Sequence, residues 1–397
     1  MNADQLAERE PIHQTVCATL QRHWSQQVDG KISISAKHVP SAEEWRFHTA
    51  LTTYIRPSAS RQTRLLVSRR NKHTRSRRRL LTTYLDGTWK ASRAVVRYRK
   101  TTDQFWVDPG IPGSNDIFIV PGNQKLRIFD LSSGSVSVVV KAGFASTSLA
   151  SELLVRDSGI PGPYLPVLST DRDGQWIEEP LVEGYSLDIL PRWRSVEGYA
   201  KHAVAQLADW LTATSVGDRS IGSHFDCMLA EAENAAATID ARYSSSLHSR
   251  IMRLMQSQFG FFPSDFELRP SLTHGDMQLA NIMVPDCGEV PVLVDWENAS
   301  YRDPSYDFLV LGLGMRSTSG REERIREFVE SGTVSPLVAS YLGHQSRGDR
   351  VIQARLCLVE DLMVRLRECT RGIYLQVPAS LLDFVAEFER LASGPLR

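Results

Sequence analysis

The sequence has 397 residues, 42% of them hydrophobic, and its 46 lysine and arginine side chains balance its 46 aspartate and glutamate side chains. This length is sufficient for two domains or one large bilobal domain, and the composition predicts a globular chain. The five cysteines form an odd set without a C-x-x-C pair, which argues against both a disulfide framework and a zinc site.

No targeting or membrane-spanning segment is visible in the sequence. The N-terminal stretch MNADQLAEREP is charged where a signal peptide needs an apolar core. The longest uncharged apolar run, FLVLGLGM from Phe308, is too short to cross a bilayer. Together with the cysteine pattern, these features predict a cytoplasmic location.

The N-terminal region, residues 1–104, contains a basic segment. Residues 61–100 hold fourteen lysines and arginines but one acidic residue, Asp86. We expect a short helix over roughly residues 11–27, followed by the strands RLLVSRR, RLLTTYL and RAVVRYRK, with the loop NKHTRSR as an arginine-rich hairpin tip. Such a surface could bind nucleic acid or another polyanion, or it could be a solvated loop on an accessory sheet.

The next region, residues 105–183, is rich in strand patterns. DIFIV, KLRIFDL and SVSVVVK are joined by short turns, which predicts an antiparallel meander. A helix follows over SLASELLVRDSG, which Gly159 and Pro161 end, and QWIEE is a further strand. The region reads as the small lobe of a bilobal chain.

Helical patterns dominate the last region, residues 184–397. We expect helices over roughly residues 196–214, 230–258, 321–330, 350–371 and 379–392. This region holds twenty-eight acidic and twenty-one basic residues. The predicted fold class is therefore α+β, with an antiparallel β-sheet small lobe, a mostly helical large lobe and a basic N-terminal extension.

A short hairpin interrupts the helical region. The apolar triplets at residues 282–284 and 292–294 flank the turn-rich linker PDCGEVP, so Asn281 and Asp295 should meet at the open end of the hairpin. An amide oxygen beside a carboxylate suits Mg²⁺, which accepts a few protein oxygens and completes its octahedron with phosphate and water. An ordinary surface hairpin with a solvated, acidic turn is the alternative.

Asp276 lies on the loop that leads into this hairpin, five residues before Asn281. An Asp, four residues, an Asn, and a later Asp after a strand form the arrangement that phosphoryl transfer uses. One carboxylate orients the attacking hydroxyl, while the Asn and the second Asp hold the metal on the phosphates. Asp276 is thus the candidate that accepts a hydroxyl proton.

These residues resemble the aminoglycoside phosphotransferase and choline kinase-like family, which has a protein-kinase-like fold. HGDMQLAN is similar to the family's H-G-D-x-x-x-x-N loop, VDWE to its metal-binding segment and RDPSYDF to its D-P-x-x-D element. The resemblance implies that Asp276 and His274 form the catalytic set, with His274 holding the loop backbone. It also implies that Asn281 and Asp295 bind metal and that Asp307 supports the loop.

A kinase-like small lobe also needs a lysine on its third strand and a glutamate on the next helix. Lys141 ends the strand VVVK, and Glu152 lies in the helix that follows. We expect Glu152 to orient Lys141 and Lys141 to hold the nucleotide's phosphates. A solvated strand-end lysine and a surface glutamate are the alternatives.

Two further segments of the small lobe concern the nucleotide. The PGNQ turn lies where a loop covering the phosphates belongs, but it lacks G-x-G-x-x-G, so a plain hairpin turn is an equal interpretation. WIEEPLVEG resembles the segment that joins the lobes, where the Glu179 carbonyl and the Leu181 N–H would pair with adenine. ATP is the expected nucleotide, with GTP left open.

We therefore expect an ATP- and Mg²⁺-dependent phosphotransferase that acts on a hydroxyl of a small molecule such as an amino sugar or amino alcohol. Two other functions stay open. One is a non-catalytic, kinase-like nucleotide-binding regulator. The other is a nucleic-acid-binding protein, or a kinase that acts on RNA, using residues 61–100.

Overall fold

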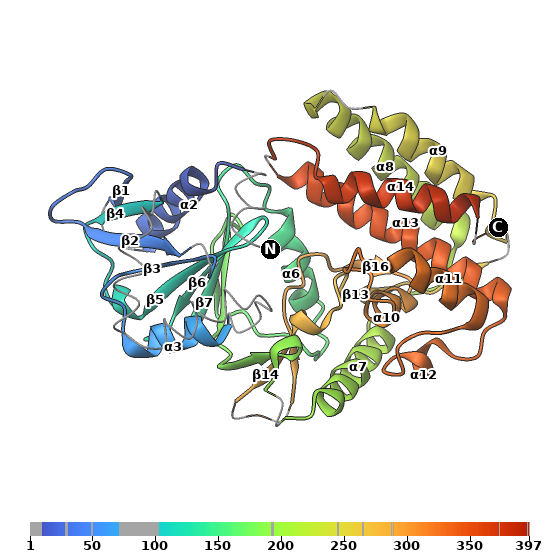
Figure 1. Ribbon diagram of the computed structural model, residues 1–397, viewed down its shortest axis with the longest axis horizontal. Helices are drawn as coiled ribbons and strands as arrows, with labels where there is room; N and C mark the ends of the chain where they lie inside the picture. The colour runs from blue at the N-terminus through green and yellow to red at the C-terminus, as the bar shows by residue number, and fades with distance from the viewer. Residues whose placement is uncertain are drawn as a thin grey trace. The chain divides into compact units, whose positions relative to one another are not determined.

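A computed structural model of the chain (Figure 1) divides into two compact units: Met1–Leu149 with Leu165–Tyr185 (unit 1), and Ala150–Tyr164 with Ser186–Arg397 (unit 2). The residues that the structure describes are 10–27, 31–48, 51–70, 103–191, 194–243, 246–263, 266–286, 288, 290–372, 374–394 and 396.

Unit 1 is built on one antiparallel sheet with the strand order β1-β4-β2-β3-β5-β6-β7-β9-β8. Strands from the N-terminal region are therefore continuous with strands from the predicted small lobe. The strands are β1 (Ser33–Ser35), β2 (Glu43–His48), β3 (Thr53–Ile55), β4 (Gln104–Asp108), β5 (Ile117–Pro121), β6 (Lys125–Asp130), β7 (Ser135–Val140), β8 (Ser169–Thr170) and β9 (Trp176–Pro180). A 3₁₀ turn, η1 (Ser114–Asp116), precedes β5.

Several sequence predictions for unit 1 are confirmed. The meander is present as β5, β6 and β7, and QWIEE forms β9. The predicted N-terminal helix is α2 (Ile12–Gln27), which lies against the sheet (Figure 1) and buries Val16, Leu20 and Trp24 in the core. A helix with one apolar face next to a sheet with one apolar face is the arrangement that buries both.

The prediction that RLLVSRR is a strand is wrong, because the segment lies in helix α3 (Arg61–Arg70). Thr63, Leu66 and Val67 are buried while Leu65 is 50% exposed, which is a helical rather than an alternating pattern. Ser60 Oγ also accepts a hydrogen bond from the Thr63 N–H at 3.2 Å, as an N-cap does. The other two predicted strands and the arginine-rich tip lie outside the described residues.

Unit 2 is mostly helical, and its longest helix, α13 (Arg347–Arg371), packs against four others, α8, α10, α11 and α14. Most residues in the middle of α13 are buried, and they include the charged residues Glu360 and Asp361. The helices of this unit are α7 (Val196–Ala213), α8 (Ile221–Tyr243), α9 (Leu247–Phe259), α10 (Ser305–Gly312), α11 (Arg321–Ser331), α12 (Ala339–Leu342), α13 and α14 (Ala379–Ser393), with α6 (Thr147–Asp157) crossing the unit boundary and the 3₁₀ turns η2 (Leu187–Ile189) and η3 (Leu279–Asn281). The α+β prediction is confirmed.

Unit 2 also contains short strands that the site uses. Strand β13 pairs with β16, β14 with β15, and β11 with β12, all antiparallel. Their bounds are β11 (Arg219–Ser220), β12 (Glu267–Leu268), β13 (Ser271–Thr273), β14 (Ile282–Pro285), β15 (Val292–Leu293) and β16 (Ser300–Arg302), and β10 (Gly184–Ser186) spans the unit boundary. Trp210 anchors α7 to β13, because its indole N–H donates to the Leu272 carbonyl at 2.6 Å.

The predicted helix over residues 230–258 is in fact two helices, α8 and α9. The Asp240 carboxylate accepts the backbone N–H groups of Leu247 and His248 at 3.0 and 3.1 Å, so it caps the start of α9 from within α8. The predicted helices over 196–214, 321–330, 350–371 and 379–392 are confirmed as α7, α11, α13 and α14. Among the described helices, none combines the length and the apolar character that crossing a bilayer requires.

A buried ion pair joins α11 to α14. Arg321 donates to both carboxylate oxygens of Glu387 at 2.8 and 2.5 Å, and a third N–H bonds to the Met315 carbonyl at 3.1 Å. The Arg321 side chain is 1% exposed. Breaking a buried pair from one side leaves an unpaired charge and costs about 3–5 kcal/mol.

We expect Glu387→Gln to lower the free energy of unfolding by about 3 kcal/mol, and the double substitution Arg321→Met with Glu387→Leu to recover most of this loss. Chemical denaturation of the three proteins measures it. The exposed pair Arg347–Glu330 offers a control, because its removal should change stability little. A Glu387→Gln variant as stable as the wild type would contradict the prediction.

Candidate active site

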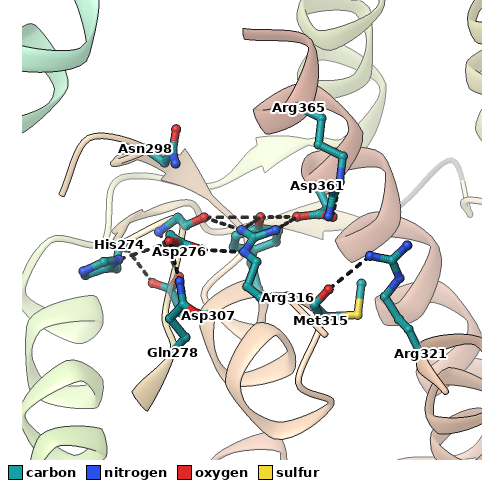
Figure 2. Close-up of polar contacts among 12 residues, drawn as sticks. His274, Asp276, Gln278, Asn298, Asp307, Met315, Arg316, Arg321, Asp361 and Arg365 are labelled. Atoms are coloured by element: carbon teal, nitrogen blue, oxygen red, sulfur yellow. Dashed lines mark hydrogen bonds and ion pairs between the residues drawn. The ribbon is translucent and has the colours of Figure 1, made fainter. Parts of the chain in front are cut away.

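The predicted catalytic loop follows strand β13 and is held by one buried carboxylate. Asp307, in the first turn of α10, accepts hydrogen bonds from the backbone N–H groups of His274 (2.6 Å) and Gly275 (2.9 Å) (Figure 2). Burial raises the pKa of Asp307 above its ordinary value, although these N–H donors act in the opposite direction. The prediction that Asp307 supports the loop is confirmed.

Gly275 allows the loop to approach the chain behind it. Its φ is 82°, and a Cβ there would lie 2.1 Å from the carbonyl oxygen of Asn298 and 2.9 Å from a guanidinium nitrogen of Arg302. An L side chain would therefore meet both an unfavourable backbone conformation and a backbone atom that cannot move aside. Glycine at this position is a steric requirement of the loop.

His274 is fixed between the loop and the hairpin. Its Nδ1 accepts from the Asp276 backbone N–H at 3.3 Å, so the ring proton belongs on Nε2, which lies 3.0 Å from the Val294 carbonyl oxygen. The ring is fully buried and packs on Trp296, with 4.5 Å between the ring centroids. This geometry supports a role in holding the loop backbone, and its place in the catalytic set stays a prediction.

The predicted hairpin is confirmed. Ile282 pairs with Leu293 and Met283 with Val292, and the Val294 N–H donates to the Asn281 carbonyl at 2.9 Å. Asn281 is therefore opposite Val294, and Asp295 is the next residue at the same open end. Asp295 has a φ of 71°, a conformation that is uncommon for residues other than glycine and that is often found at functional sites.

Asp276 is surrounded by donors. Its Oδ2 accepts from the side-chain amide of Gln278 at 2.8 Å, and its Oδ1 accepts from Arg316 at 2.5 Å (Figure 2). Oδ2 also accepts from the side-chain amide of Asn281 at 3.0 Å. The Asp276 side chain remains 21% exposed. The carboxylate is thus oriented from both sides and still reachable by a ligand.

Arg316, on the turn after α10, is a site residue that the sequence analysis missed. Its guanidinium contacts the Asp276 carboxylate, the Gly275 carbonyl (2.8 Å) and the carboxylate of Asp361 on α13. Burial by itself would lower the pKa of Arg316, but Asp361, Tyr306 and Asp276 raise it well above its ordinary value. The sequence contains no spacing rule that links this arginine to the loop forty residues earlier.

Asp361 anchors this arginine from the helical core. Its side chain is fully buried and also accepts from Arg365 at 3.0 Å and from the Tyr306 hydroxyl at 3.1 Å. Burial would raise the pKa of Asp361, but the guanidinium groups of Arg316 and Arg365 lower it well below its ordinary value. Asp361 is therefore an ionised, buried carboxylate that fixes Arg316 in place.

The donor set at the hairpin end fits a magnesium ion bound together with phosphate. Asn281 Nδ2 donates to the Asp276 carbonyl (2.8 Å) and to its carboxylate, so the amide oxygen is directed away from Asp276. An amide oxygen and the Asp295 carboxylate are ligands that Mg²⁺ accepts. Within the described residues, no group of three or more His, Cys, Asp and Glu could hold a metal ion. Phosphate and water would complete the coordination of an ion held by these two side chains.

The nucleotide-binding predictions concern unit 1 and the start of unit 2. Lys141 is fully buried, forms an ion pair with Glu10 just before α2, and donates to the Asn123 carbonyl at 3.3 Å. In unit 2, a carboxylate oxygen of Glu152 lies 3.6 Å from a guanidinium nitrogen of Arg156. The pairing of Lys141 with Glu152 stays a prediction, and no sequence pattern indicated Glu10 as a partner of Lys141.

One of the two groups predicted to contact adenine is bonded within unit 1 in the structure. The Leu181 N–H donates to the Gly134 carbonyl at 2.8 Å, so it would have to leave this carbonyl to pair with adenine, and the adenine contact stays a prediction. The strand pairing of β9 with β7 continues to Pro180 opposite Ser135, which brings Leu181 to this carbonyl. The contact predicted for the Glu179 carbonyl stays a prediction.

Comparison with known proteins supports the resemblance. Residues 188–336 match the model of the phosphotransferase enzyme family, and this range contains Asp276, Asn281, Asp295 and Asp307. The family resemblance and the enzyme class, a phosphotransferase (kinase), are thereby confirmed. No curated protein matches the sequence.

Similar solved structures share little sequence with this chain. A choline/ethanolamine kinase family protein from Mesorhizobium loti is 14% identical, with 77% of this chain and 95% of that chain covered and a TM-score of 0.45. A thermostable mutant of aminoglycoside phosphotransferase APH(4)-Ia is 13% identical, with 70% and 94% covered and a TM-score of 0.48. The choline kinase LicA from Streptococcus pneumoniae is 14% identical, with 71% and 90% covered and a TM-score of 0.41.

We expect Gly275→Ala to lower the free energy of unfolding by more than about 4 kcal/mol, because the new methyl group would overlap a backbone oxygen. Gly222→Ala on α8 is the matched control, since a Cβ there meets nothing within 4 Å. Thermal and chemical denaturation of both variants measure the difference. Equal stability of the two variants would show that the loop does not need this close approach.

The lowered pKa of Asp361 predicts a pH dependence of stability. Its stabilising contribution is fully present above the ordinary pKa of 3.8 and is lost as the pH falls toward the lower folded value. Below pH 3.8 the free energy of unfolding should therefore fall more steeply in the wild type than in Asp361→Asn, by up to about 1.4 kcal/mol per pH unit. Denaturant titrations from pH 5 to pH 3 measure both slopes, and parallel curves would contradict the assignment.

Proposed function

We propose that the chain transfers the γ-phosphoryl group of ATP, with Mg²⁺, to a hydroxyl group of a small molecule. The observation that carries this proposal is the meeting of the Asp276 loop with the Asn281 and Asp295 end of the hairpin. Phosphoryl transfer needs little covalent chemistry from the protein, and catalysis is mostly positioning and charge stabilisation. A rigid loop beside a pair of metal-accepting oxygens supports both.

Asp276 is proposed to receive the acceptor hydroxyl. Because Arg316, Gln278 and Asn281 already donate to the carboxylate, its orientation is fixed before a ligand arrives. The carboxylate oxygens can accept a hydrogen bond from the hydroxyl. The role is therefore to orient the hydroxyl and to accept its proton as the new bond to phosphorus forms.

Asn281 and Asp295 are proposed to hold the metal. When bound, Mg²⁺ would supply positive charge next to the phosphates. The chain's own contribution is to present the two oxygens at one edge. Hydrogen bonds to Asp276 fix the Asn281 amide, and the Val294 N–H bond to the Asn281 carbonyl holds the residue before Asp295. The proposed nucleotide contacts are Lys141, Glu152 and the Glu179 carbonyl. To reach a phosphate, the Lys141 ammonium group would have to leave the Glu10 carboxylate or bind both groups at once.

The acceptor class follows from charge. Residues 184–397 hold twenty-eight acidic and twenty-one basic side chains, an excess that favours a cationic acceptor such as an amino sugar or amino alcohol. For a nucleic-acid acceptor the described residues offer no support, since only 61–70 of the basic segment are described and these form α3.

We expect acceptor-dependent ADP release from Mg²⁺-ATP when amino sugars and amino alcohols are screened, and a fall in kcat of roughly 10²–10⁴ for Asp276→Asn. Asp383→Asn, an exposed aspartate on α14, is the matched control and should keep full activity. Coupled ADP detection and identification of the phosphorylated product measure it. Nucleotide binding without turnover on any acceptor would favour a non-catalytic regulator.

A further inference from the structure

Unit 2 contains a cavity of about 520 Å³ that the proposed phosphoryl transfer does not use. Helices α8 and α13 and strand β16 form most of its wall. This volume lies within the range of pockets that bind small molecules. Its buried floor is made by His224, Met228, Arg302, Glu360 and Met363.

Glu360 is the unusual member of this wall. It is 1% exposed, and its Oε1 lies 3.2 Å from the backbone nitrogen of Asp303 and 3.4 Å from His224 Nε2. Its other oxygen, Oε2, has no hydrogen-bond partner among the described residues. A buried carboxylate oxygen without a donor is costly, and burial accordingly raises the pKa of Glu360.

Two arginines that line the cavity, Arg302 and Arg367, are bonded to acceptors other than Glu360. Arg302 donates to the Thr273 hydroxyl (2.7 Å) and the Asn298 carbonyl (2.9 Å), and Arg367 is paired with Glu231 at 2.5 Å. Neither arginine donates to Glu360 Oε2. An ammonium group would give this oxygen the hydrogen-bond donor that it lacks.

The cavity is separate from the Asp276 site. Arg302 forms part of its wall and contacts the catalytic loop from behind through Thr273. The partners of the Asp276 carboxylate, Arg316, Gln278 and Asn281, do not line the cavity. Glu360 and Asp361 are neighbours on α13, but Asp361 serves the catalytic loop and Glu360 serves the cavity wall.

We propose that this cavity is a second ligand site, which takes a small organic molecule with a protonated amino group. The ammonium group would bond to Glu360 Oε2, and the apolar part would lie against Met228 and Met363. Cys227, an exposed thiol on α8, lies at the rim.

Benzylammonium, benzyl alcohol and benzoate test this proposal, because they share one ring and differ in the head group. Ligand-observed NMR titration of the full chain should show benzylammonium binding at least tenfold more tightly than the other two. Glu360→Gln should weaken its binding roughly 10- to 100-fold, the loss expected for a charge-assisted hydrogen bond. Benzyl alcohol or benzoate binding as tightly as benzylammonium would overturn the proposal.

Three further variants locate the binding and keep the test valid if Glu360→Gln does not fold. Cys227→Trp places a large ring at the rim and should abolish binding, whereas Cys227→Ser should leave it unchanged. Asp276→Asn should also leave it unchanged, because Asp276 belongs to the other site. Full binding to Cys227→Trp, or loss of binding in Asp276→Asn, would each overturn the proposal.

Discussion

The candidate active site depends on the buried carboxylate of Asp307, which accepts hydrogen bonds from two backbone N–H groups of the catalytic loop. At the end of β13 the chain leaves its strand pairing, and Asp307 accepts the two successive N–H groups of His274 and Gly275. Unpaired buried N–H groups are rare because their desolvation is costly. With these groups satisfied, the chain can turn through the left-handed conformation of Gly275 and present Asp276 to solvent.

A second constraint then fixes the direction of the Asp276 side chain. Arg316 lies between Asp276 and the buried Asp361, so the position of the candidate catalytic carboxylate is set by a helix in the core of unit 2. Arg321 adds to this arrangement, because it holds the Met315 carbonyl next to Arg316. The site is thus supported by ion pairs that are buried or nearly so, in which each guanidinium has more than one oxygen partner.

The sequence allowed the hairpin and its open end to be predicted, because apolar triplets and a turn-rich linker determine their pairing locally. The roles of Arg316 and Asp361 could not be predicted, since they lie on a turn and a helix far along the chain with no fixed spacing to the loop. Glu10 was missed for the same reason, because 131 residues separate it from Lys141. The prediction of a strand at RLLVSRR was wrong because its apolar residues fit the periodicity of a strand as well as that of a helix. Tertiary packing buries the residues that share one face of the helix.

The proposed phosphoryl transfer requires that the open end of the hairpin bind a divalent ion together with the nucleotide's phosphates. Electron paramagnetic resonance of Mn²⁺ in the presence of ATP tests it directly, because bound Mn²⁺ loses its free-ion signal. We expect the wild type and Asp286→Asn, altered at the closed end of the hairpin, to bind the ion equally, and Asp295→Asn to bind it at least tenfold more weakly. Undiminished Mn²⁺ binding by Asp295→Asn would contradict it.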